Sequence, residues 1–276
     1  MGNYDEENPN ELLIQTGGLS LHRAIEKKDY EAVNALIKLG ADVNAFSEEE
    51  DTLFKEMTPL GIAFYMFDEY SVKALLEAGA DVNLKTTAEN TALGEILGYM
   101  KDNYFSFDKI PLIEKLLKLL VDNGLKINDT VDKKGNTAFI KACKSIDENN
   151  LSNGKTLAAV VAKFLLKENC DVNSTNLYGQ TALMFLCASR DVESQDLQIQ
   201  VLEAGADVGT MDKNGDTPLI YAAKNRNANS GKEMAELLFD FGDPKLEHVN
   251  NDGKTALEIA TDLNNEEFVK FLLTKM

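Results

Sequence analysis

The sequence contains no tryptophan, only three cysteines and two histidines, and no long uncharged apolar run. Three cysteines cannot build a disulfide framework in a chain of 276 residues, and none of them forms a C-x-x-C pair. Two histidines are too few to complete an obvious metal site. We therefore predict no metal and no cofactor, and we expect Cys143, Cys170 and Cys187 to be small buried residues in a reducing compartment.

Basic residues are scarce relative to acidic ones. The 28 Lys and Arg stand against 46 Asp and Glu, a formal net charge of −18, which disfavours binding to nucleic acids or anionic membranes. No apolar stretch approaches the ~20 residues of a membrane-spanning helix. The acidic, polar first residues are unlike a secretory signal. We expect a cytoplasmic protein without a nucleic-acid or membrane partner, and delivery into another cell by a route without a sequence signal stays open.

Two short motifs recur in register along the chain. The first reads Gly-Ala-Asp-Val-Asn in 40–44 and 79–83, with looser copies further on, and the second reads Thr-Pro-Leu in 58–60 and 217–219. Recurrence at a period of a few tens of residues is typical of repeat proteins, in which each unit buries its apolar face against its neighbours. The motifs define seven units, which start near residues 19, 58, 91, 137, 181, 217 and 255.

The residues of one unit predict two short antiparallel helices. Thr58 can cap the first helix and Pro59 occupies the first turn, where proline is best tolerated. Gly79 ends the second helix as a C-cap glycine does. Apolar residues at helical spacing predict the buried faces of the two helices, namely Leu60, Ala63, Phe64, Val72, Leu75 and Leu76.

This combination of a T-P-L-H-x-A head and a G-A-D-V-N tail resembles the ankyrin repeat, and the resemblance covers about residues 18–276. It implies an all-α repeat solenoid of stacked helix-turn-helix units joined by β-hairpin-like fingers. We expect residues 18–276 to form one repeat domain and residues 1–17 to be an N-terminal tail or capping segment. Insertions lengthen the first finger at 46–54, the third unit at 99–109 and the fourth at 144–155. For the fourth unit, surface drift and a functional loop both stay open. The aromatic residues of the third unit's insertion either pack onto the flank of the solenoid or form a contact patch.

The resemblance also implies protein–protein recognition rather than catalysis. The one candidate phosphate loop, 149–156, has Asn149 where the first glycine is required, and no catalytic motif is found. We predict a module that is a monomer on its own and binds a partner protein as a scaffold or adaptor. The alternative is an inhibitor that covers a partner enzyme's active site. An enzyme or a nucleic-acid binder agrees less well with the sequence.

In the ankyrin family, partners contact the finger tips and the exposed face of each first helix. Carried onto this sequence, the candidates are Phe54, Met57, Tyr65, Met66, Tyr99, Lys133, Lys134, Lys144, Tyr178, Lys213 and Lys224. A wider set of groove positions holds nine lysines against four acidic residues, which predicts a basic groove and a partner with an acidic segment and an apolar anchor. Two plainer interpretations stay open: the finger insertion could bury the apolar candidates, and the lysines could be ordinary solvated side chains.

Overall fold

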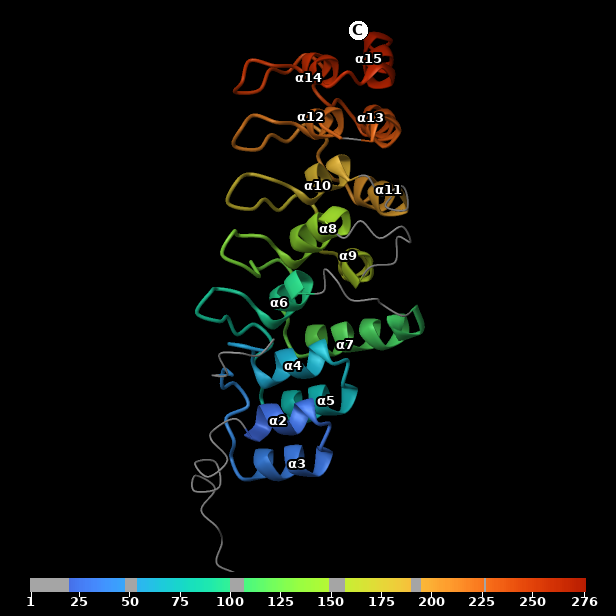
Figure 1. Ribbon diagram of the computed structural model, residues 1–276. Coiled ribbons are helices and arrows are strands. Elements are labelled where there is room, and N and C mark those ends of the chain that lie inside the picture. Colours follow the sequence, from blue (N-terminus) through green and yellow to red (C-terminus); the bar gives the residue numbers. More distant parts are fainter. Residues whose placement is uncertain (1–19, 48–53, 100–106, 149–156, 190–194, 226) are drawn as a thin grey trace, which may run out of the picture. The chain divides into compact units, whose positions relative to one another are not determined.

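The computed structural model describes residues 20–47, 54–99, 107–148, 157–189, 195–225 and 227–276 (Figure 1). Within these ranges the regular structure is helical, and the predicted N-terminal segment 1–17 lies outside them. The helices alternate between the first and the second helix of successive pairs. They are α2 Ser20–Glu26, α3 Tyr30–Lys38, α4 Pro59–Tyr65, α5 Glu69–Glu77, α6 Ala92–Tyr99, α7 Ile110–Asp122, α8 Ala138–Glu148, α9 Leu157–Lys167, α10 Ala182–Ala188, α11 Gln195–Glu203, α12 Pro218–Ala223, α13 Ala228–Phe241, α14 Ala256–Asp262 and α15 Glu266–Leu273.

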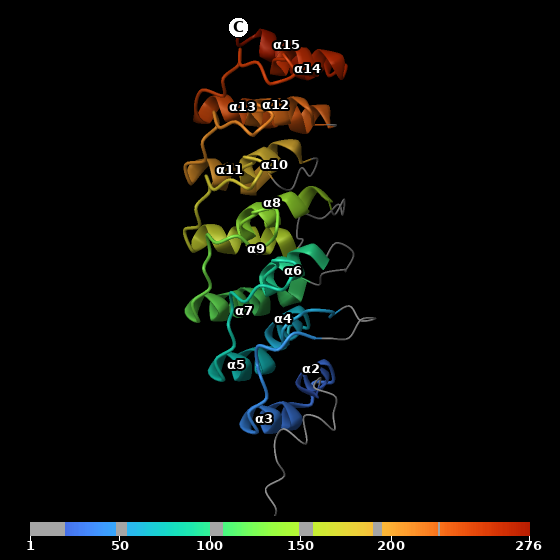
Figure 2. The ribbon, with the colours of Figure 1, turned by 90° about the vertical axis from the view of Figure 1, so that its left-hand side faces the viewer.

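The chain divides into two compact units. Unit 1 is Met1–Ile96 with Lys109–Lys126, and unit 2 is Leu97–Asp108 with Ile127–Met276. In unit 1, α2 packs on α3 and α4, and α5 packs on α3, α4 and α7. In unit 2 the first helices α8, α10, α12 and α14 pack in succession, and the second helices α9, α11, α13 and α15 form a parallel row beside them (Figures 1 and 2). Each unit is therefore a stack of helix pairs.

Threonine caps begin the first helices as the sequence predicted. The Thr58 side chain accepts a hydrogen bond from the backbone N–H of Gly61, and Pro59 follows in the first turn of α4. Further threonine caps of the same kind are Thr181, Thr217 and Thr255. The predicted apolar face of the second repeat is confirmed, because none of its six residues exceeds 8% exposure. Burial of these side chains is the main force that holds neighbouring helix pairs together.

The asparagine of the Gly-Ala-Asp-Val-Asn motif joins one repeat to the next. In unit 1 the Asn44 side chain accepts a hydrogen bond of 2.8 Å from the backbone N–H of Asp81. In unit 2 Asn173 does the same for Asp207, also at 2.8 Å. The following copy of the motif ends in Gly209, which has no side chain to make this bond. The motif thus encodes a contact between repeats as well as a turn.

The three cysteines are buried free thiols, as predicted. Burial raises the pKa of Cys143 well above its usual value and that of Cys170 to about 12, so neither is a reactive thiolate near neutral pH. His22 has a structural contact, with Nε2 lying 3.1 Å from the carbonyl oxygen of Ala45.

The two long insertions are only partly described. In the fourth repeat α8 continues to Glu148, so Lys144 belongs to a lengthened first helix rather than to a loop. Residues 149–156 lie outside the described ranges, as do Tyr104 and Phe105 of the third repeat's insertion. Tyr99 ends α6, and its side chain also lies outside the description. The alternatives given for each of the two insertions therefore stay open.

The second finger contains a strained backbone position that offers a test of the alignment of the repeats. Glu89 has φ of +62° where the next finger has Gly135 at +72°. A left-handed conformation costs a non-glycine residue about 1–2 kcal/mol, and glycine's greater unfolded-state entropy returns about 0.5–1 kcal/mol of that. We expect Glu89→Gly to raise the unfolding free energy by about 0.5 kcal/mol in urea denaturation. Ala88→Gly, at an adjacent exposed position without positive φ, should lower the unfolding free energy. Equal losses in both variants would contradict the left-handed conformation of Glu89 and its alignment with Gly135.

Candidate functional site

The fingers of unit 2 share one hydrogen-bonded design. An Asp or Asn at the start of each finger accepts hydrogen bonds from the backbone N–H groups two and four residues later, which closes the turn around a glycine. For Asp212 these bonds come from Asn214 at 2.8 Å and Asp216 at 2.9 Å, and Gly215 has φ of +75°. The equivalent residues of the other fingers are Asp132, Asn176 and Asn250. A turn closed in this way keeps its shape without help from a partner.

The same fingers are hydrogen-bonded to one another. The backbone N–H of Leu177 donates to the carbonyl of Lys134 at 3.0 Å, and that of Lys213 donates to the carbonyl of Tyr178 at 2.9 Å. Asn251 of the last finger continues the row by donating its backbone N–H to Asn214. Four successive fingers therefore form one continuous edge of unit 2. Such an edge loses little conformational entropy when it binds a partner.

Five side chains stand on this edge at the tips of three fingers. Leu177 is 60% exposed and Tyr178 is 52% exposed, and neither is expected to face water without a use. Lys133 and Lys134 lie exposed on the preceding finger, and Lys213 lies exposed on the following one. We call these five residues the tip surface. The tip surface combines two apolar side chains with three lysines on the neighbouring, hydrogen-bonded fingers.

The first helices behind the fingers carry fewer free charges than the sequence suggested. Lys224 pairs with Asp216, whose side chain is only 6% exposed, and Lys141 lies 3.5 Å from Asp132. Lys144 lies over the ring of Phe185, 5.4 Å from its centroid. The predicted basic groove is therefore partly neutralised from within unit 2, and the exposed lysines of the tip surface are what remains of it.

Polar networks link these helices to the fingers. The Tyr221 hydroxyl donates to Asp212 at 2.9 Å and accepts from Gln180 at 2.7 Å. Burial, together with the neighbouring Asp212, raises the pKa of Tyr221, so its hydroxyl stays protonated and keeps donating. Burial alone would raise the pKa of Asp132, but hydrogen bonds from Asn136 and the charge of Lys141 outweigh it and lower the value. The Asp132 carboxylate is therefore an ionised structural acceptor.

The apolar candidates in unit 1 differ in how far their side chains are exposed. Phe54 and Tyr65 contact each other edge to face, with ring centroids 5.5 Å apart, and both are half-buried. Met66 is also half-buried at the end of α4. Met57 is 2% exposed, and its backbone carbonyl accepts a hydrogen bond from the Ser47 N–H, so its prediction as a surface contact is wrong. Burial therefore removes Met57 from the candidates and leaves the other three only partly exposed.

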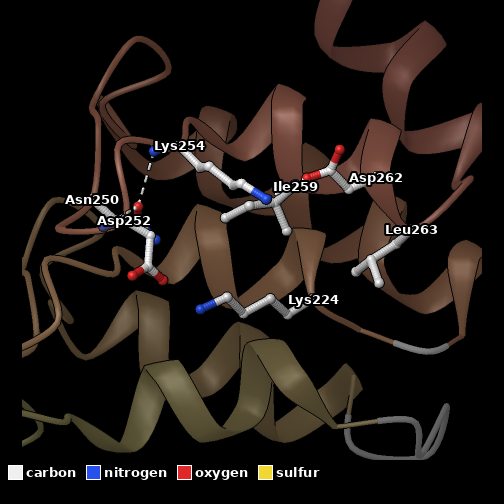
Figure 3. Close-up of a pocket in the computed structure, with 7 residues that line it drawn as sticks. All are labelled: Lys224, Asn250, Asp252, Lys254, Ile259, Asp262 and Leu263. Carbon is white, nitrogen blue, oxygen red and sulfur yellow. Dashed lines mark hydrogen bonds and ion pairs between the residues drawn. The ribbon is translucent and has the colours of Figure 1, made fainter.

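A pocket of about 240 Å³ lies on the groove side of the last two repeats (Figure 3). Seven residues of α12, α14 and the last finger line it, namely Lys224, Asn250, Asp252, Lys254, Ile259, Asp262 and Leu263. Four of these residues were among the groove positions taken from the sequence, namely Lys224, Asp252, Lys254 and Asp262. Leu263 and Ile259 were missed because apolar residues at the end of a helix read as core, and only the packing shows that Leu263 is 55% exposed.

Family models match two parts of the chain. A model described as ankyrin repeats in three copies matches residues 152–227 and 192–276, and a model of the single ankyrin repeat matches residues 19–48. The chain belongs to the ankyrin repeat family. Its helix pairs are those the resemblance implied, and the predicted all-α repeat fold is confirmed.

Solved ankyrin domains show the same fold. The ankyrin repeat domain of human ASB11 aligns with a TM-score of 0.65 at 25% identity, covering 93% of this chain and 97% of that one. The ankyrin repeat domain of Bcl-3, described as a unique member of the IkappaB family, aligns with a TM-score of 0.67 at 18% identity, covering 92% and 97%. The second likeness concerns the fold alone. Ankyrin repeats are in general protein–protein interaction modules.

Curated relatives are much longer than this chain and match only part of it. An ankyrin repeat protein of Acanthamoeba polyphaga mimivirus is 28% identical over 56% of this chain and 43% of its own length. The tyrosine-protein kinase HTK16 of Hydra vulgaris is 29% identical over 63% of this chain but 23% of its own length. The chain therefore matches less than half of each of these proteins. Among the described residues of this chain, no helix is both long and apolar enough to cross a membrane, and no cluster of His, Cys, Asp or Glu could hold a metal ion.

Proposed function

We propose that this ankyrin repeat chain binds a partner protein through the tip surface of unit 2. One observation carries the proposal: the hydrogen-bonded row of fingers holds Leu177 and Tyr178 exposed between Lys134 and Lys213. A rigid edge with an exposed aromatic residue resembles the hot spots that dominate binding energy in interfaces. The partner we propose has an acidic segment beside an apolar anchor.

The charge distribution supports this choice of partner. The chain as a whole has a net charge of −18, whereas the tip surface contains three lysines and no acidic residue. An acidic segment would be repelled by most of the molecule and attracted here, which favours both orientation and association rate. Because these lysines are exposed, their contribution should weaken as salt is raised.

The experiment compares two double variants for capture of partners from the source cells, followed by affinity measurement on the purified partner. We expect Leu177→Ala/Tyr178→Ala to lower affinity at least about 30-fold, the loss typical of hot-spot residues. Tyr65→Ala/Met66→Ala, at the end of α4 in unit 1, should leave the affinity nearly unchanged. Circular dichroism and thermal unfolding of both variants control for folding.

The opposite pattern would refute the proposed surface. Loss of binding in the Tyr65/Met66 variant alone would move the interface to unit 1, where the sequence also predicted anchors. Equal binding by both variants would mean that neither apolar pair contacts the partner. A salt-independent affinity would argue against a role for the three lysines.

We propose a scaffold or adaptor role, with inhibition of a partner enzyme as the alternative. A preorganised edge serves either role, because both need only stable binding in one orientation. If the captured partner is an enzyme, its activity in the presence of saturating chain separates them. An adaptor leaves turnover unchanged, whereas an inhibitor that covers the active site abolishes it.

A further inference from the structure

The pocket of the last two repeats has a charge preference of its own. In Figure 3, Lys224 and Lys254 run along two sides of it, Asp252 lies at one end, and Asp262 and Leu263 lie toward the other. Two lysines and two aspartates sum to no net charge in the lining. Whether the pocket favours a cation or an anion therefore depends on which carboxylates the two lysines already pair with.

Lys224 forms an ion pair with a buried carboxylate. It pairs with Asp216, whose side chain is 6% exposed and which also accepts a hydrogen bond of 2.8 Å from the Asn250 side chain. Drawing Lys224 away toward an anionic ligand would leave Asp216 buried without its cation, which is costly. Lys224 and Asp216 therefore behave as a neutral pair.

Lys254 lies among three carboxylates. It pairs with Asp262 at 2.6 Å, and hydrogen bonding to Asp262, with the added charges of Asp252 and Glu258, raises its pKa. One of these carboxylates, Glu258, closes the capping box of α14 with Thr255. With Lys224 paired to Asp216 and Lys254 paired to Asp262, Asp252 is the charged residue of the lining that makes no ion pair within the described part of the chain. These pairs leave the lining with one net negative charge, at Asp252.

Asp252 is the carboxylate available to a ligand. Its backbone N–H donates to Asn250, but within the described part of the chain no hydrogen bond or ion pair is made to its side chain. Ile259, which is 7% exposed, lies between Asp252 and the 55% exposed Leu263 at the other end of the pocket, and these two residues provide an apolar wall (Figure 3). A carboxylate beside an apolar wall matches a side chain that has an aliphatic stem and a cationic head.

We propose that this pocket receives a basic side chain, lysine or arginine, from a partner protein, with its stem on Ile259 and Leu263 and its charge at Asp252. The inference rests on the proposed binding function and deepens it. The partner would present an acidic, apolar-anchored segment to the tip surface and a basic residue to the last two repeats. Opposite charges at separate places would fix the direction in which the partner lies along unit 2.

The test selects binders from a phage-displayed library of random peptides on the immobilised full chain. Parallel selections use the wild type, Asp252→Asn, Asp252→Lys and the control Asp240→Asn, which makes the same charge change at an exposed position of α13. We expect the wild type and the control to enrich a basic residue at one fixed position. A synthetic peptide with that motif should bind Asp252→Asn about fivefold more weakly, the upper range for an exposed ion pair. Asp252→Lys should select an acidic residue instead.

Three results would overturn the inference. These are a wild-type motif with an acidic residue that depends on Lys224 or Lys254, a basic residue whose enrichment survives both Asp252 variants, and the absence of any motif. Selection on Leu177→Ala/Tyr178→Ala separates the two proposals. Loss of an acidic-apolar motif in that variant supports the tip surface, and an unchanged motif contradicts it. Dependence of the basic residue on Asp252 supports the pocket, and enrichment that does not depend on Asp252 contradicts it. Each proposal can therefore fail while the other stands.

Discussion

Replacing Asp212 by alanine should lower the unfolding free energy by about 3 kcal/mol, because buried donors left without an acceptor cost about 1–3 kcal/mol each. Asp212 is 6% exposed and accepts hydrogen bonds from two backbone N–H groups and from the Tyr221 hydroxyl. Removing its carboxylate opens the turn of the third finger of unit 2 and frees Tyr221. Urea denaturation followed by circular dichroism measures the loss.

Asparagine at the same position is the matched control. The equivalent residues of the neighbouring fingers, Asn176 and Asn250, accept the same pair of backbone bonds through an amide oxygen. We expect Asp212→Asn to cost no more than about 1 kcal/mol, the worth of the single bond to Tyr221. If alanine and asparagine were equally harmful, the negative charge rather than the acceptor geometry would be what the finger needs.

The second large effect concerns the close approach of one finger to the next. A Cβ at Gly179 would lie 3.2 Å from both the Cα of Asp212 and the backbone nitrogen of Lys213, and backbone atoms cannot move aside as a side chain can. Gly179 also has φ of +75°. We expect Gly179→Ala to lower the unfolding free energy by about 3 kcal/mol, from about 1–2 kcal/mol for the left-handed conformation and about 1–3 kcal/mol for the overpacking.

Gly253 separates the two causes. Its φ of +74° is nearly the same, but nothing lies within 4 Å of a Cβ built on it. Gly253→Ala should therefore cost only the conformational part, about 1–2 kcal/mol, less about 0.5–1 kcal/mol, which the smaller unfolded-state entropy of alanine returns in both variants. Both variants are compared by urea denaturation and by hydrogen exchange of the finger amides. Equal losses would mean that the fingers of unit 2 are not packed against one another as the structure has them.

Much of the fold could be predicted from local signals. The Thr-Pro heads, the apolar spacing and the Gly-Ala-Asp-Val-Asn tails each depend on residues a few positions apart, so helix starts, buried faces and turns follow from short-range geometry. The candidate site was predicted less well. Tyr178, Lys133, Lys134 and Lys213 lie on the surface as expected, but Met57 is core and Lys224 is bound to a buried aspartate.

By itself the sequence determined that the chain is a stack of helix pairs, where each pair begins and which tips carry lysine and tyrosine. Only the tertiary structure decided which of those side chains remain available. Lys224 forms an ion pair with Asp216 and Met57 is buried, whereas Asp252 and Leu263 line a pocket. The reason is physical: repeat motifs specify contacts inside a unit, but free charge and exposure depend on neighbours that are distant in the sequence.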